Sequence, residues 1–311
     1  MLKIIISPAK KMRHNDDIID WDQLPIFLNE ANEIKNDLSE KTYEELKAIW
    51  QCNDKIAQLN VGRLQQMNLT HPLTPARLGN KSLQYPLTPA RLGNEGLQSQ
   101  LTPTVLGNEG LQYPLTPAVL GNEGLQSQLT PAVLAYEGLQ YQYMAPQVFD
   151  HDQWDYIRLH LKILSGFYGI LGATDGITPY RLEMQAKYEI NGSKNLYHYW
   201  NRKIYDVLVE KTSVIINLAS KEYSKAIEPY LDDQVNYITI TFGELTEHKG
   251  KRITTKATAA KMARGEMVRY MAEYNIKEPE ELKAFGRLNY TFSQADSTTN
   301  NYVFLKETAR K

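Results

Sequence analysis

Two stretches of the chain share one pattern: residues 2–11 read LKIIISPAKK, and residues 213–221 read SVIINLASK. Each is a short apolar run, rich in β-branched residues, that stops at a serine and a lysine, which is typical of a buried strand. Because ligands of α/β sheets gather at the carboxyl ends of strands, we expect Ser7 and Ser220 to lie near a bound phosphate or carboxylate. Two serine turns with solvated lysines are the alternative interpretation.

Helical and strand-like patterns are intermixed along the rest of the chain, without strict alternation. This mixture predicts an α+β (mixed α/β) fold: a single compact domain over residues 1–311, with a mixed β-sheet enclosed by helices. The predicted helices are residues 28–38, 43–65 (with Thr42 as its cap), 154–164, 195–209, 221–227, 259–274 and 278–284. The predicted strands are residues 2–6, 213–218, 237–242, 252–255 and 302–305, the last at a sheet edge.

The composition is that of an ordinary globular protein. The chain has 311 residues, a net charge of −1, 42% hydrophobic residues and one cysteine, Cys52. These values exclude a disordered chain and a disulfide scaffold. Because no apolar run approaches the roughly 18 residues of a membrane span and the N-terminal run is too short for a signal peptide, we expect a soluble, cytoplasmic protein with no membrane partner.

The distribution of charge is more informative than its sum. Residues 3–13 and 249–264 are basic and contain no acid. They are either solvated faces or two parts of one anion-binding surface.

Residues 73–142 form five tandem 14-residue units that begin with Leu-Thr-Pro. Recurrent proline and glycine argue against a coiled coil. We interpret residues 73–128 as a tandem-repeat insertion in a surface loop, because loop length costs entropy only logarithmically. An array that binds a partner is the alternative.

Two cations lie in the first two turns of the predicted helix 259–274, namely Lys261 and Arg264. Cations near a helix N-terminus oppose the helix dipole, and a docked anion removes that conflict. A solvated face is the alternative. We expect the apolar face of this helix to consist of Ala259, Ala263, Met267, Tyr270 and Tyr274.

Residues 164–184 contain four glycines, at positions 166, 169, 172 and 176. They could cradle a phosphate, although the spacing is not that of a P-loop. The turn also resembles a helix-hairpin-helix turn with one extra residue between Gly166 and Gly169. Arg181 and Glu183 are either paired site residues or charges on an extended segment. The six histidines lack the spacing of metal ligands, so we expect no metal or cofactor.

Taken together, six segments resemble the YaaA family, cytosolic bacterial proteins linked to peroxide stress. The chain departs from the family pattern at two positions: Leu139 stands where the family has Asp, and Gln185 stands where it has Gly. Residues 129–142 are the family-like unit of the repeat. The matching segments are Ser7–Lys10, Asp54–Ala57 with Asn60 and Arg63, Leu164–Gly166 with Tyr168-Gly169, Pro179–Met184, Asn217–Ser220 with Glu222-Tyr223, and Lys261 with Ala263–Gly265.

The resemblance implies a role in limiting oxidative damage, including lower free iron, and binding of double-stranded DNA in a basic cleft. It also implies a helix-hairpin-helix element, which we place at residues 160–184. We expect DNA phosphates to be contacted by Lys10, Lys55, Arg63, Arg181, Lys261 and Arg264. We expect supporting roles for Ser7, Asp54, Gly166, Gly169, Glu183 and Ser220.

An enzyme is the alternative function. It acts on a phosphorylated or carboxylated small molecule in the same cleft, with Glu183 or Asp54 as acid or base. Catalytic residues are otherwise unassigned. Iron sequestration by direct ligation is the weakest of the hypotheses.

Overall fold

The computed structural model describes residues 1–14, 19, 21–69, 129–246 and 252–306. The predicted insertion at residues 73–128 lies outside these ranges, as do residues 247–251 between the predicted strands 237–242 and 252–255. All elements below belong to one compact unit built from residues 1–69 and 129–311.

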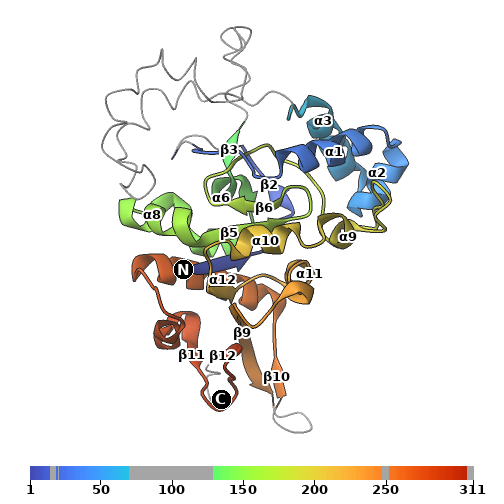
Figure 1. Cartoon of the computed structure of the whole chain (residues 1–311). Helices are drawn as coiled ribbons and strands as arrows, with labels where there is room; N and C mark the ends of the chain where they lie inside the picture. The colour runs from blue at the N-terminus through green and yellow to red at the C-terminus, as the bar shows by residue number, and fades with distance from the viewer. Residues whose placement is uncertain (15–18, 20, 70–128, 247–251, 307–311) are drawn as a thin grey trace, which may run out of the picture. The chain divides into compact units, whose positions relative to one another are not determined.

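A mostly parallel sheet forms the centre of this unit (Figure 1). Its strand order is β11-β12-β9-β8-β1-β5-β6, in which β12, β9, β8, β1 and β5 run parallel and the outer strands β11 and β6 run antiparallel to their neighbours. Ile4 at the centre lies between Ile216 and Leu161 and is fully buried. The strands are β1 (Leu2–Ile6), β5 (Leu161–Ser165), β6 (Gly169–Gly172), β8 (Val214–Asn217), β9 (Asn236–Thr246), β11 (Tyr290–Phe292) and β12 (Asn301–Lys306).

Shorter strands extend or flank this sheet. β10 (Arg252–Thr254) pairs antiparallel with the end of β9, as predicted. Two small ladders join β2 (Lys11–Met12) to β4 (Tyr136–Glu137) and β3 (Thr130–Pro131) to β7 (Gly176–Ile177).

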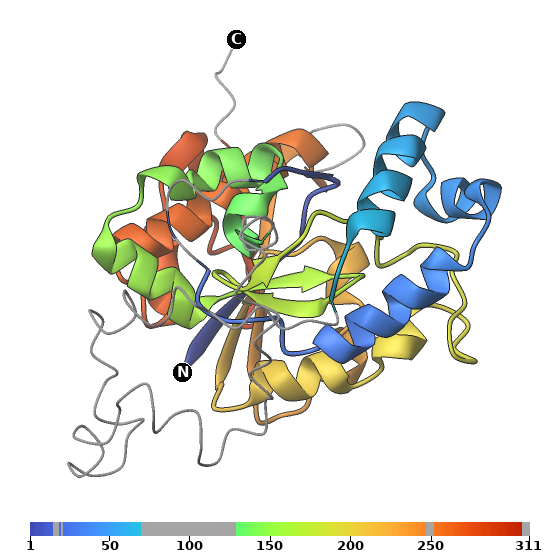
Figure 2. The same cartoon turned by 90° about the horizontal axis from the view of Figure 1, so that it is seen from above.

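Helices cover both faces of the sheet. In Figure 2, α8 and α12 lie on one face, and α10, with α1 and α9 beside it, lies on the other. The helices are α1 (Leu28–Ser39), α2 (Tyr43–Trp50), α3 (Asp54–Gln66), α6 (Ala132–Ala135), α7 (Leu139–Met144), α8 (His151–His160), α9 (Leu196–Trp200), α10 (Lys203–Val209), α11 (Lys221–Ser224) and α12 (Ala257–Glu273). The 3₁₀ helices are η3 (Pro146–Val148), η4 (Glu228–Tyr230), η5 (Pro279–Ala284) and η6 (Arg287–Asn289).

The predicted mixed α/β class with a helix-flanked sheet is confirmed, but several element boundaries were wrong. The helix predicted at 43–65 breaks between α2 and α3, because Gln51 adopts φ 45° and Asn53 caps α3 by accepting from the N–H of Ile56. The helix predicted at 195–209 breaks at Asn201, which also adopts a φ of 45°. The strand predicted at an edge, β12, lies between β11 and β9.

At residues 160–184 the structure also differs from the prediction of a helix-hairpin-helix element. The helix predicted at 154–164 ends at His160, and Leu161–Ser165 forms β5 because pairing with β1 and β6 decides its structure. β6 and β7 follow, so this segment is a strand region and not the predicted helix-hairpin-helix.

The fifth repeat unit belongs to the core. Residues 129–142 form β3, α6, β4 and the start of α7, and Ala132–Ala135 are almost completely buried. Within the described residues, no helix is both long and apolar enough to cross a bilayer.

Candidate anion-binding site

The two similar strand ends, β1 and β8, are joined through their serines. The Ser7 hydroxyl donates to the Ser220 hydroxyl at 3.1 Å and accepts from the backbone N–H of Ser220 at 2.8 Å. Tyr141 of α7 donates to the carbonyl oxygen of Ser7 at 3.0 Å. These hydrogen bonds hold the ends of β1 and β8 together beside α7. We call residues 7–10 and 218–220 the carboxyl edge.

Glu183 holds two of the predicted cations at this edge. Its carboxylate lies 2.7 Å from Lys10 Nζ and 2.8 Å from Arg181 Nη2. The Lys10 side chain is 66% exposed, whereas Arg181 is only 9% exposed and also donates to the carbonyl oxygens of Lys10 and Trp50. The three charges sum to +1, so the cluster keeps one exposed positive charge while Arg181 serves mainly to hold the loop in place.

Gly166 places Glu183 at the end of β5. A Cβ at residue 166 would lie 2.8 Å from the carbonyl oxygen of Leu182 and 3.0 Å from the backbone of Glu183. The backbones therefore meet only because residue 166 has no side chain. Gly169 lies elsewhere: it has φ +70° and a Cβ there would meet the ring of Trp200, which indicates packing in the core.

Helix α3 carries three of the predicted site residues. Asp54 accepts from Lys47 at 2.8 Å and from Tyr43 at 2.9 Å, and these bonds lower the pKa of Asp54. It is therefore held as an ionised acceptor, which disfavours the predicted acid role. Arg63 donates to the carbonyl of Met12 at 3.0 Å, which ties α3 to β2. Lys55 is exposed and makes no ion pair with any described residue.

Arg264 is the unusual cation of the set. Ala260 and Val268, one turn before and after it on the same side of α12, are buried, and Arg264 itself is half-buried with its Nε shielded from solvent. Burial alone lowers the pKa of Arg264. Its Nε has no hydrogen-bond partner, and no carboxylate pairs with it in the described part of the chain. Taking an ion out of water without a partner costs on the order of several kcal/mol.

Helix α7 connects Arg264 to the carboxyl edge. A Cβ on Gly265 would lie 1.9 Å from the carbonyl oxygen of Gln140, so α7 and α12 touch backbone to backbone. Gly138, which precedes α7, is close to Ala9: a Cβ there would lie 3.3 Å from the Ala9 Cβ. Lys261, one turn before Arg264, is exposed. The six predicted cations thus form three groups: Lys10 and Arg181 beside Glu183, two on α3, and two on α12.

The two basic stretches meet only in part. Lys11 and Arg13 lie at 2.5 Å and 3.6 Å from Glu137, and Lys256 lies 2.6 Å from Glu244. Lys3 donates to the carbonyl oxygen of Leu159. These cations therefore each have a partner near them in the fold. The two stretches are linked through residues 138–140, which contact Ala9 and Gly265.

Glu222 is a candidate that the sequence argument missed. Burial raises the pKa of Glu222, and Glu183 nearby raises it further, against the N–H of Gln185 and the charge of Lys10. A hollow of about 600 Å³ adjoins it, lined by residues 185–189, 194, 195 and 197. Two neighbouring carboxyl groups with different environments suit acid–base chemistry. The only signal in the sequence was its place in one of the family-like segments.

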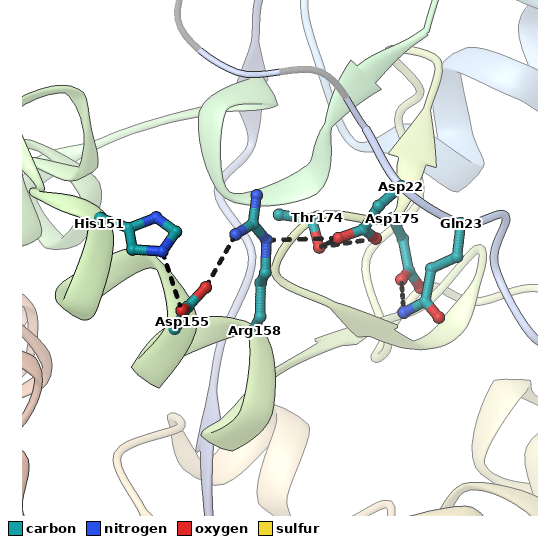
Figure 3. A network of polar contacts seen from close by, with 7 residues as sticks. All are labelled: Asp22, Gln23, His151, Asp155, Arg158, Thr174 and Asp175. Atoms are coloured by element: carbon teal, nitrogen blue, oxygen red, sulfur yellow. Dashed lines mark hydrogen bonds and ion pairs between the residues drawn. The ribbon is translucent and has the colours of Figure 1, made fainter. Parts of the chain in front are cut away.

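A second polar cluster lies at the opposite end of the strands (Figure 3). Asp175 accepts from Gln23 at 2.7 Å and from the N–H of Gly172 at 2.9 Å, and Thr174 donates to Asp22. Gly172 pairs with Lys162 near the start of β5, so we call this cluster the amino-edge network. Burial raises the pKa of Asp175 to about 6.

Arg158 completes the amino-edge network. Its guanidinium lies 3.4 Å from Asp22 and 3.1 Å from Asp155, and Asp155 in turn lies 3.5 Å from His151 (Figure 3). Among the residues that the structure describes, no three His, Cys, Asp or Glu side chains are grouped as metal ligands.

Comparisons with known proteins agree with this arrangement of segments. The family model described as peroxide stress protein YaaA matches residues 2–92 and 115–296. A UPF0246 protein of Agathobacter rectalis is 44% identical over 99% of this chain and all of that protein. UPF0246 proteins of Lachnoclostridium phytofermentans and Ligilactobacillus salivarius are 41% and 43% identical over 98% of this chain, and the matches cover 96% and 100% of those proteins.

Proposed function

This chain belongs to the peroxide stress protein YaaA family, and on that premise we propose that it acts in the cytoplasm by binding double-stranded DNA during oxidative stress. The exposed cations around the carboxyl edge contact phosphates of the duplex. Lys10 contributes from the loop after β1, Lys55 from the start of α3 and Lys261 from α12. Arg63 and Arg181 position these segments through their bonds to backbone carbonyls.

One observation carries this proposal: exposed cations from both ends of the sequence lie on segments joined to the carboxyl edge. Lys55 and Lys261 make no ion pair with any described residue, and Lys10 stays 66% exposed although it pairs with Glu183. Arg63 fixes α3 to residue 12, and Gly138 and Gly265 fix α7 between residue 9 and α12. Phosphate contacts made by separate lysines suit a polyanion with regularly spaced charges, and they give affinity without sequence preference.

A salt titration of DNA binding tests the proposal. The double variant Lys55→Gln/Lys261→Gln is compared with Lys211→Gln/Lys277→Gln, whose exposed lysines lie outside the carboxyl edge. A 30-base-pair duplex is titrated by fluorescence anisotropy between low and moderate salt. Losing two phosphate contacts reduces the slope of log K against log salt by about 1.8, since each contact contributes about 0.9. Equal slopes in both double variants would remove the proposal.

Protection from iron-dependent damage follows, in this proposal, from covering DNA rather than from iron ligands on this chain. Purified protein incubated with ferrous iron and then desalted is expected to retain none in stoichiometric amount. Retention of one iron per chain by metal analysis contradicts this route.

The pair of Glu183 and Glu222 favours a second candidate function, an enzyme for a phosphorylated or carboxylated small molecule. The charge of Lys10 acts on Glu222, and Glu222 accepts from the N–H of Gln185, which lines the hollow. In this alternative Glu222 donates a proton and Lys10 holds the anion. Glu222→Gln then abolishes turnover in a screen of phosphate esters, whereas under the leading proposal it leaves duplex affinity unchanged.

A further inference from the structure

Two unpaired donors lie where α7 and α12 touch. Arg264 Nε on α12 and Gln140 Nε2 on α7 are buried without hydrogen-bond partners among the described residues. The Gln140 residue is only 6% exposed, and its backbone carbonyl meets Gly265, the residue after Arg264. Buried polar groups in folded proteins are nearly always hydrogen-bonded, so both donors are available to an acceptor from outside the described chain.

The acidic side chains near α12 do not supply this acceptor. Glu266 lies 2.9 Å from Arg287, and Glu273, at the last residue of α12, lies 2.6 Å from Arg269. Glu244, on the neighbouring strand β9, lies 2.6 Å from Lys256. Each carboxylate is already engaged with another cation, which leaves the charge of Arg264 uncompensated within the described chain.

We propose that Arg264, Gln140 and Lys261 form a recessed binding site for a phosphate monoester or inorganic phosphate. The guanidinium of Arg264 and the amide Nε2 of Gln140 offer N–H donors, and they match the acceptor oxygens of a phosphate. Lys261, one turn before Arg264, supplies a second positive charge, which suits a group that carries close to two negative charges at neutral pH. The site extends the proposed function, with which it shares Lys261, but it depends on Arg264 and Gln140, so the two proposals can fail separately.

Thermal unfolding with and without inorganic phosphate tests the site. Phosphate at ten times its Kd raises the Tm of the native chain by about 3 °C or more, because it binds only the folded state. Arg264→Met keeps the volume and removes the charge, so it abolishes this shift and raises the Tm in phosphate-free buffer. Arg158→Met, which removes a guanidinium paired with Asp22 and Asp155, lowers the Tm and retains the phosphate shift.

The outcomes are distinct. A lower Tm or an unfolded chain for Arg264→Met without phosphate, or an unchanged phosphate shift, overturns the proposal. Gln140→Met weakens phosphate binding by about tenfold in calorimetry, since one charge-assisted hydrogen bond is lost. An unchanged Kd for this variant overturns the assignment of Gln140.

Blunt duplexes with 5′-phosphate or 5′-hydroxyl ends identify the source of the phosphate. Tighter binding of the phosphorylated duplex by the native chain, absent in Arg264→Met, assigns the site to strand ends. Equal binding of the two duplexes, together with an Arg264-dependent phosphate shift, assigns it to a small phosphorylated compound. If no duplex binds but the phosphate shift persists, the site stands and the DNA proposal falls.

Discussion

Two arginines at opposite ends of the parallel strands have opposite surroundings. Arg158 in the amino-edge network has two carboxylates within 3.4 Å, and one of them, Asp22, also accepts from Thr174 (Figure 3). Arg264, connected through α7 to the carboxyl edge, has no carboxylate partner among the described residues, and burial is the only cause that shifts its pKa.

This difference separates a structural role from a binding role. Where charges satisfy one another, as around Arg158, the polar groups tie distant segments together and no ligand is needed. Where a cation is buried and unpaired, the folded chain bears a desolvation cost on the order of several kcal/mol that a ligand can remove. Parallel sheets favour the same assignment, since their ligands bind at the carboxyl ends of strands.

Gly265→Ala gives the largest expected effect, because the contact between α7 and α12 depends on it. The added Cβ would lie 1.9 Å from a backbone oxygen that no rotamer change can move. We expect a loss of about 3 kcal/mol or more in the free energy of unfolding, measured by urea denaturation. Gly62→Ala in α3 is the control, since nothing lies within 4 Å of its Cβ; it should stabilise the helix by about 0.5–1 kcal/mol. Similar destabilisation by both substitutions would contradict the close helix contact.

Asp175 makes the stability of the amino-edge network depend on pH between its ordinary pKa of 3.8 and its raised pKa of about 6. An arginine such as Arg264 does not titrate in this range. Because the folded-state pKa of Asp175 is the higher of the two, between these values the folded chain binds more protons than the unfolded chain. The contribution of Asp175 to stability is therefore fully present below pH 4 and is lost as the pH rises through 6, with a slope of at most about 1.4 kcal/mol per pH unit.

Asp175→Asn tests this pH dependence by urea denaturation at pH 4, 5, 6 and 7. The variant lacks the contribution of Asp175, so its stability should vary less across this window than that of the native chain. Asp22, whose pKa burial also raises, remains in both proteins and contributes in the same direction. Identical profiles for the two proteins would show that Asp175 does not titrate abnormally.

Glu183→Gln removes the acid that balances two cations at the carboxyl edge. Arg181 then keeps only its backbone acceptors, and we expect a loss of about 2 kcal/mol in the free energy of unfolding. Duplex binding should become about threefold tighter or more, since Lys10 is released and one negative charge is lost. Glu273→Gln is the matched control: Glu273 also pairs with two arginines, but at the last residue of α12. Equal affinity of both variants for DNA would separate Glu183 from the binding surface.

Much of the carboxyl edge could be predicted from local sequence. The apolar runs that end at Ser7 and Ser220 predicted two buried strands whose carboxyl ends gather at one edge, although the contact between the two serines was not predicted. The same logic failed for Leu161–Ser165, whose apolar spacing continues that of α8 and whose strand pairing depends on β1, more than 150 residues earlier.

The unpaired state of Arg264 and the amino-edge network could not be predicted. The expected apolar face of the helix included Tyr274, which is 61% exposed, and omitted Ala260 and Val268, which are buried. The buried face is rotated because α12 packs against α7 as well as the sheet. The hydrogen bond between Gln23 and Asp175 joins residues 152 positions apart, and neither residue belongs to a sequence motif that would predict this contact.

The cap of α3 gives the smallest expected effect and tests whether that helix belongs to the binding surface. Asn53 accepts from the N–H of Ile56 at 3.0 Å, and this cap sets where α3 begins and therefore where Lys55 lies. Asn53→Ala should cost about 1 kcal/mol in stability. It should also weaken duplex binding about twofold, because Lys55 loses a fixed position near phosphate. Thr42→Ala removes the comparable cap of α2, which carries no predicted DNA contact, and should cost a similar amount without changing affinity. If both caps change DNA affinity alike, the effect reflects general loosening of the helical pair, and α3 would have no special place at the carboxyl edge.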